Sequence, residues 1–206
     1  MTAHPSIFVA SRATFFFHTL SNGKIMNDKL LVENVLKGDE KAFESLMKQY
    51  QRLVGHIVFR IVGGMEKEEV MHDVFLKVYR KLGEFNFQSK LSTWIATIAY
   101  REAINHARKN KRNNEMQDLD SAELVESDVE GFESKDMSLF VQAAVDKLPV
   151  PYRSILTLYH LQGFSYQEIV EVMEMPEGTV KNYLFRARKK LKEILAPYIE
   201  NEALLG

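Results

Sequence analysis

Apolar residues in the first half of the chain recur at helical spacing. From Phe43 to Ile61 they fall on one face for about five turns, a pattern that predicts an amphipathic helix. Asp39 stands where it can cap the first turn, and Gly63 and Gly64 interrupt the pattern. One long helix is therefore expected between Asp39 and Gly63.

Two more helices are expected before residue 113, at about 67–82 and 91–112, joined by a loop at 84–90 with two aromatic residues. No segment alternates as a strand would. We therefore expect residues 27–112 to form a small all-α bundle. The inward faces of these two helices carry Val70, Met71, Val74, Val78, Leu82, Leu91, Ile95 and Ile98.

Residues 139–206 predict a second helical module. One helix ends near Pro149, and the next runs from about Pro151 to Gln162, with Gly163 as its C-terminal stop. Ser165 and Glu168 form a capping box at the start of a third helix, and Pro176 occupies the expected first residue of a fourth. The inner face of this last helix is Val180, Leu184, Ala187 and Leu191.

The other side of the last helix is basic, and the pair of helices has helix-turn-helix spacing suited to a DNA major groove. Arg186 and Arg188 are expected to approach guanine edges and Asn182 an adenine edge, while some of these residues contact only phosphates. The side chains available for DNA are Lys181, Asn182, Phe185, Arg186, Arg188, Lys189 and Lys192.

Aromatic and basic residues also interleave in the first module, as single-stranded nucleic acid requires, because bases stack on rings and cations hold phosphates. For Trp94 and Tyr100 simple core packing is the alternative. The set is Phe85, Phe87, Lys90, Trp94, Tyr100, Asn105 and Arg108.

Charge divides the chain into unlike parts, although the formal net charge is only -1. Residues 27–112 hold 16 Lys and Arg against 11 Asp and Glu, and residues 113–138 hold nine acids and one lysine. The 113–138 segment is therefore expected to be a flexible acidic linker between two domains. Two interpretations of this linker are open: a solvated connector with no further role, or a segment that competes with DNA for the basic surfaces and weakens DNA binding by the free chain.

Composition excludes several classes of site. Cysteine is absent, which rules out disulfides and thiolate metal sites and fits a cytoplasmic protein. No apolar run is long enough to span a bilayer, so membrane insertion is not expected. Residues 1–26 lack the pattern of a signal peptide and are interpreted as a mis-called extension or a disordered tail, with Met26 as the natural start.

The motifs of both modules resemble those of bacterial sigma factors of the extracytoplasmic-function (ECF) group of the sigma-70 family. The stretches "GDEKAFESLMKQYQRLV", "EEVMHDVFLKVYRKLGEF" and "STWIATIAYREAINHARKNKR" are similar to their second region, in the right order. The stretch from "KLPVPYRSIL" to "FRARKKLKEIL" is similar to their fourth region. The resemblance implies a non-enzymatic RNA polymerase subunit that selects promoters, helps to melt DNA, and is often held by an anti-sigma factor.

The resemblance also implies three sets of site residues. Core-polymerase binding is assigned to Asp73, Lys77, Val78, Tyr79 and Lys81. Binding of the minus-ten element is assigned to Phe85, Asn86, Phe87, Lys90, Ser92, Thr93, Trp94, Tyr100, Asn105, Arg108, Lys109 and Arg112. Binding of the minus-thirty-five element is assigned to Ser165, Glu177, Thr179, Lys181, Asn182, Phe185, Arg186, Arg188 and Lys189.

The chain departs from the family pattern at the turn before the last helix, where Glu174 replaces the usual Gly and Val170 a small residue. A non-glycine residue at positive φ costs about 1 kcal/mol, so a slightly different bend is expected there. The alternatives are a self-sufficient DNA-binding regulator, an enzyme and a partner-binding adaptor. The histidines are scattered and no phosphate-binding loop is present in the sequence. We therefore expect no catalytic residue, no bound metal and no cofactor.

Overall fold

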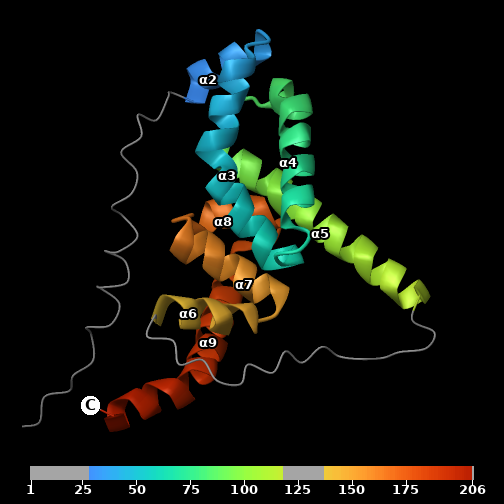
Figure 1. Ribbon diagram of the computed structural model, residues 1–206. Coiled ribbons are helices and arrows are strands. Elements are labelled where there is room, and N and C mark those ends of the chain that lie inside the picture. Colours follow the sequence, from blue (N-terminus) through green and yellow to red (C-terminus); the bar gives the residue numbers. More distant parts are fainter. Residues whose placement is uncertain (1–27, 118–136, 206) are drawn as a thin grey trace, which may run out of the picture.

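The computed structural model describes residues 28–117 and 137–205, with side chains at 28–110 and 141–197, and every regular element in these ranges is helical (Figure 1). This confirms the predicted all-α class. The elements are α2 (Asp28–Leu36), α3 (Glu40–Val62), α4 (Lys67–Lys81), η1 (Leu82–Glu84), α5 (Leu91–Gln117), α6 (Met137–Asp146), α7 (Val150–Leu156), η2 (Thr157–Leu161), α8 (Tyr166–Met173) and α9 (Glu177–Leu205).

The ends of α3 lie where the sequence predicted them. The Asp39 carboxylate accepts hydrogen bonds from the amides of Lys41 (2.9 Å) and Ala42 (3.2 Å). Gly63 ends the helix at φ +83°, and its amide donates to the carbonyl of Phe59. Capping of this kind satisfies backbone groups that a helix leaves unpaired.

Helix α2 was not predicted, although Leu31, Val32 and Val35 have helical spacing. These three residues are buried, and α2 packs against α3 and η1. Gly38, at φ +86°, turns the chain from α2 into α3. At the other end of this domain α5 continues to Gln117, so the first residues of the predicted linker are helical. The predicted extension at 1–26 and most of the linker lie outside the described residues.

In the second domain the capping box forms as expected. The Ser165 hydroxyl accepts from the Glu168 amide (3.3 Å), and the Ser165 amide donates to the Glu168 carboxylate (2.8 Å). Glu174 adopts left-handed backbone angles, φ 53° and ψ 44°, so the turn keeps the glycine-like conformation that the substitution put in doubt. Pro176 immediately precedes α9 rather than beginning it.

The helix expected at 151–162 is divided. Helix α7 ends at Leu156 and is followed by one π-helical turn, η2, in which the Gln162 amide donates to the carbonyl of Thr157 (3.0 Å). A π-turn adds one residue to a helical turn and changes the directions of the side chains around it. The sequence pattern gave no sign of this turn.

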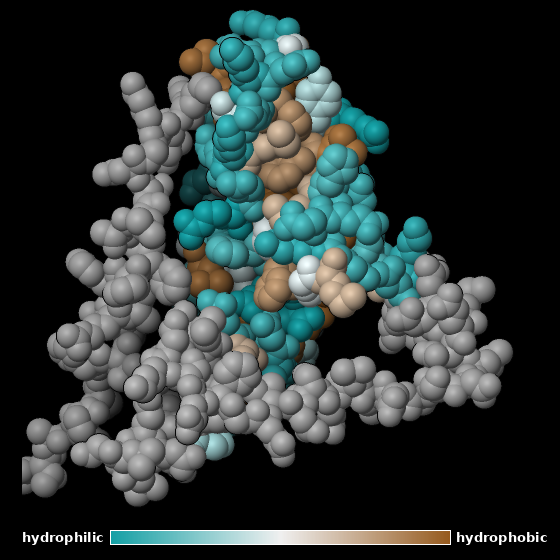
Figure 2. Space-filling view, viewed as in Figure 1, coloured by the Kyte–Doolittle hydropathy of each residue, from teal (hydrophilic) through white to brown (hydrophobic). Residues whose placement is uncertain are grey.

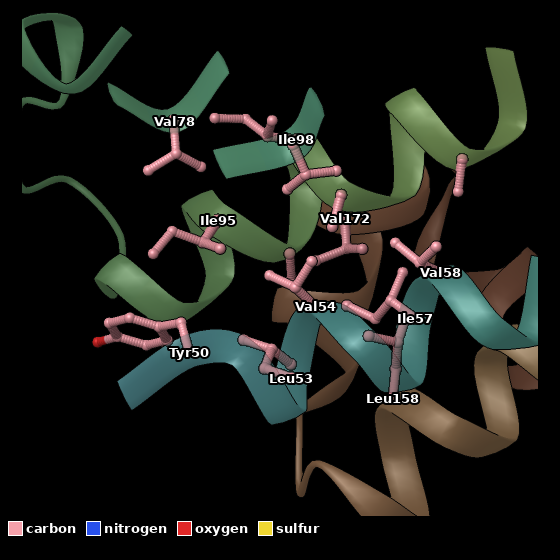
Figure 3. Packing of buried hydrophobic residues seen from close by; sticks show 14 of the residues in the cluster. Tyr50, Leu53, Val54, Ile57, Val58, Val78, Ile95, Ile98, Leu158 and Val172 are labelled. Atoms are coloured by element: carbon pink, nitrogen blue, oxygen red, sulfur yellow. The ribbon is translucent and has the colours of Figure 1, made fainter. Parts of the chain in front are cut away.

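The two domains share one continuous apolar core (Figure 3). Leu158 of η2 and Val172 of α8 lie beside Val54 and Ile57 of α3, with Ile98 of α5 close by. Figure 1 shows α2 to α5 in one half of the molecule and α6 to α9 in the other, where α7 and η2 pack against α3 and α8 packs against α5. Within the described ranges, no helix is both long and apolar enough to cross a membrane.

Candidate nucleic-acid interface

Helix α9 is anchored by its predicted inner face and exposes its outer face. Val180, Leu184 and Ala187 are buried, with at most 1% of each side chain exposed. The opposite side presents predicted DNA-binding residues to solvent: Asn182, Phe185, Arg186 and Lys189. Phe185 is 67% exposed, and an apolar ring in that position can contact a thymine methyl group.

The remaining predicted minus-thirty-five residues are in other settings. Lys181 pairs with Glu177 one turn earlier at 2.6 Å. Thr179 is half-buried in the first turn of α9, and Ser165 is the exposed cap of α8. Arg188 is drawn sideways, because its Nε donates to Nε2 of His160 (3.2 Å).

The aromatic loop between η1 and α5 is compact. The centre of the Phe85 ring lies 4.6 Å from the centre of the Phe87 ring and 5.4 Å from that of the Trp94 ring. Phe85 is buried, whereas Phe87 is 48% exposed at φ 60°. The Asn86 side chain accepts from the amide of Gln88 (3.2 Å) and shapes the turn.

Trp94 and Tyr100 on α5 are half-buried and pack against the apolar core, so the packing alternative accounts for much of their contact. Ser92 is also half-buried. Farther along α5, Asn105, Arg108 and Lys109 are exposed. The side chain of Arg112 lies outside the described residues.

Helix α8 covers the beginning of α5, which is part of the segment assigned to the minus-ten element. The Glu168 carboxylate lies 3.0 Å from the Lys90 ammonium and accepts from the Thr93 hydroxyl at 3.4 Å. Thr93 is fully buried. At the other end of α8, Glu174 pairs with Arg101.

Glu168 is held ionised by these contacts. Burial opposes its negative charge, but the Ser165 amide and the Lys90 ammonium outweigh burial and lower the pKa of the carboxyl below its ordinary value. One ionised carboxylate therefore caps α8 and also pairs with a cation of the first domain.

Two further polar contacts join the domains, and sequence reasoning missed both. The guanidinium of Arg60, buried in α3, pairs with Asp146 at the end of α6. The amide of Gln162 lies 2.7 Å from Nδ1 of His56, whose pKa is lowered by burial and then by nearby cations. The sequence signal for the first contact was the position of Arg60 within the apolar face of a predicted helix, because a buried charge requires a partner.

The predicted polymerase-binding face of α4 needs one correction. Val78 is fully buried and packs in the core beside Ile95 and Ile98 (Figure 3), so its side chain is not part of that face. Tyr79 is exposed, and its ring meets that of Phe43 edge-on at 4.9 Å. The other predicted members, Asp73, Lys77 and Lys81, line a shallow hollow with Leu76, Arg80 and Glu102.

Beside this hollow runs an apolar groove between α3 and α4. Figure 2 shows hydrophobic surface along the seam of these helices, flanked by hydrophilic residues. Val35, Phe43, Leu76 and Tyr79 supply the apolar lining of its upper part. Among the residues with described side chains, no group of three or more His, Asp or Glu is placed to hold a metal ion.

Comparison with known proteins identifies the family. Residues 46–113 match the model of sigma-70 region 2, and residues 141–191 match the model of sigma-70, region 4. The chain is 33% identical over 190 residues to the ECF RNA polymerase sigma-E factor of Escherichia coli (strain K12), covering 84% of this chain and 97% of that protein. It is 34% identical over 184 residues to the RNA polymerase sigma-H factor of Pseudomonas aeruginosa, covering 84% and 95%.

Two solved structures share the fold. The sigma factor RpoE of Bartonella quintana, in complex with the anti-sigma factor NepR, matches with a TM-score of 0.62 at 23% identity, covering 76% of this chain and 98% of that one. CnrH in complex with the cytosolic domain of CnrY matches with a TM-score of 0.60 at 18% identity, covering 82% and 97%.

The chain therefore belongs to the sigma-70 family, in its ECF group. Its function is that of a sigma factor, which directs promoter recognition. The matches to both regions disfavour a self-sufficient DNA-binding regulator.

Proposed function

We propose that the chain brings core RNA polymerase to promoters through three surfaces: α4, the segment from Phe85 to Arg112, and α9. The domain at 139–206 would hold the minus-thirty-five element, and the domain at 27–112 would hold the polymerase and the minus-ten element. The observation that carries this division is the anchoring of α9, whose inner face is buried while four of the predicted DNA-binding residues are exposed.

On α9, Asn182, Phe185 and Arg186 are the residues proposed to recognise bases. An amide suits adenine, a guanidinium suits guanine and an aromatic ring suits the thymine methyl group. Lys189 adds a cation on the same outer face. The exposure of all four side chains supports this assignment.

The described arrangement is proposed to be a closed form. Because Thr93 is buried under α8 and Lys90 is paired with Glu168, a DNA strand reaches this part of α5 only after α8 moves away. Docking of the two domains at separate places on the polymerase would keep them apart and compensate for the inter-domain interactions that break. Two weak DNA-binding modules fixed on one enzyme then act together through effective concentration.

Core polymerase is proposed to bind α4 through Asp73, Lys77, Tyr79 and Lys81. The exposed Tyr79 ring beside an apolar groove supports this face, because exposed aromatic residues next to apolar surface mark many protein interfaces. The chain itself would perform no chemistry and need no cofactor, nucleotide addition being the work of the core enzyme. It would act in the cytoplasm, where an anti-sigma factor would hold it as NepR holds RpoE.

Transcription in vitro tests the proposed function. Core RNA polymerase is incubated with a library of genomic fragments, with and without the full chain, and transcript starts are mapped. Discrete starts that need both components are expected. If the chain alone shifts duplex DNA and no new start appears with polymerase, the chain acts as a regulator and the proposal is wrong.

A further inference from the structure

Four side chains form a ladder along one flank of α9. The Lys181 ammonium lies 5.7 Å from the ring centre of Tyr166, which stacks on Tyr159 with 5.4 Å between centres and 25° between planes. The Arg188 guanidinium lies over the other end, 5.2 Å from the Tyr159 ring centre. Two stacked rings therefore separate two cations of α9.

The rings are well placed to fix the positions of these cations. Tyr159 belongs to the π-turn η2, and Tyr166 to the first turn of α8, and both are half-buried against the core. A cation within about 6 Å of an aromatic centre is attracted by the negative face of the ring. The ladder thus connects α9 to η2 and to α8.

His160 adds a second restraint on Arg188. Its Nε2 accepts from Nε of Arg188, and burial together with Arg188 lowers the pKa of the imidazole, which favours the neutral, accepting form. The two terminal nitrogens of Arg188 make no hydrogen bond within the part of the chain that the structure describes. They remain available to an anion. Lys181 is less available, because it already pairs with the Glu177 carboxylate.

The place of these cations on α9 indicates which part of DNA they meet. Lys181 and Arg188 are seven residues apart, about two turns or ~10 Å along the helix. At about 100° per residue they lie on the flank, between the buried face through Val180 and the exposed face through Asn182 and Lys189. When a helix enters a major groove, its outer face meets base edges and its flanks meet the sugar-phosphate walls.

We propose that Tyr159 and Tyr166 are positioning residues that hold Arg188 and Lys181 for contact with backbone phosphates of the minus-thirty-five duplex. Arg188 then contributes affinity and register, not base choice, which differs from the guanine contact that sequence alone predicted. This inference rests on the proposed DNA-binding role of α9.

The test uses the full chain bound to core polymerase and duplexes selected by this complex from random DNA. Tyr159→Leu is expected to weaken binding about two- to fivefold on every selected sequence, the range that a cation–ring contact of about 0.5–1 kcal/mol gives. Tyr159→Phe, which keeps the ring, should bind as the parent does. Arg188→Gln should lower the salt slope of log K by about 0.9, the loss of one phosphate contact, and leave the preferred bases unchanged.

The decisive readout is coupling between the two residues. Tyr159→Leu should have no further effect in an Arg188→Gln background, and Tyr166→Leu none in a Lys181→Gln background. Equal losses in both backgrounds, or a changed base preference in Arg188→Gln, would overturn the ladder proposal while the selected sequences still supported the function of α9. If the parent complex enriches no sequence, the proposed function fails first and the ladder proposal falls with it.

Discussion

The Glu168 carboxylate of α8 lies 3.0 Å from the Lys90 ammonium of the first domain, and it also accepts a hydrogen bond from the amide of Ser165. The Glu168 carboxylate thus completes the capping box of α8 and also holds the second domain against α5. Stability of α8 and closure of the two domains depend on the same side chain. In the proposed open form, separation of the domains would leave the cap intact and release Lys90.

Loss of the ion pair between Glu174, at the end of α8, and Arg101 of α5 should favour the open form. Glu174→Gln removes the charge that pairs with Arg101. Because both side chains are more than half exposed, the pair contributes at most about 1 kcal/mol, and single-stranded DNA should bind the free chain up to about fivefold more tightly. Fluorescence anisotropy with a labelled oligonucleotide at low salt measures the change.

The matched control is Glu171→Gln, which alters charge on the same helix at an exposed residue with no partner in the described part of the chain. A general charge effect would raise DNA binding equally in both variants. Such equality would remove the support for a closed form held by Glu174.

Removal of the Asp146 carboxylate should separate the domains without unfolding them. Asp146→Ala leaves the guanidinium of Arg60, which is only 7% exposed, without its partner. A broken buried pair is costly, but the carboxylate is 40% exposed, so the closed form should lose about 1–3 kcal/mol. Opening hydrates the cation, and limited proteolysis should cut between the domains sooner while far-ultraviolet circular dichroism stays unchanged. A uniform loss of helix would contradict this account.

Acidification should also open the molecule. The pKa of His56 is lowered in the closed form by burial and by Arg52, Arg60 and Lys67. The open form, with its imidazole nearer the ordinary pKa of 6.5, binds the proton more strongly, so closure is fully favoured above pH 6.5 and weakens as the pH falls below it. An inter-domain distance probe titrated from pH 7.5 to 5.5 measures the effect.

Two variants separate the contribution of His56. His56→Gln should remove the pH dependence of closure, whereas His160→Gln, within the second domain, should leave it in place. A pH response that survives His56→Gln would assign the transition to another group.

Adjacent residues of α4 should behave in opposite ways. Val78→Ala opens a cavity in the core and should lower the free energy of unfolding by about 2 kcal/mol, measured by urea denaturation. Tyr79→Ser, at an exposed ring, should change stability by less than about 1 kcal/mol but weaken binding to core polymerase. If Val78→Ala alone weakened polymerase binding at full stability, the corrected face of α4 would be wrong.

The sequence predicted local structure correctly where a few neighbouring residues determine it. Asp39 predicted the start of α3, Ser165 and Glu168 predicted the capping box, and the steps between Val180 and Ala187 predicted the buried face of α9. Each depends on hydrogen bonds or spacing within one or two turns. Such features do not require knowledge of distant contacts.

Contacts between distant elements were less accessible. Nothing local to Lys90 or Thr93 indicates that α8 covers them, and the π-turn at Thr157–Leu161 has no sequence signature. Burial of Val78 was different, because its step of four from Val74 already placed it on the inner face. The resemblance to a family assigned it to the polymerase-binding face, where its side chain is not exposed.

Movement of α8 away from α5 is tested most directly by a distance measurement. The chain has no cysteine, so spin labels can be attached at Lys109→Cys on α5 and Glu171→Cys on α8 alone. Double electron–electron resonance should give one narrow distance for the free chain and a longer one in the complex with core polymerase and promoter DNA. The same distance in both states would contradict the closed and open forms and the proposed access of DNA to Lys90 and Thr93.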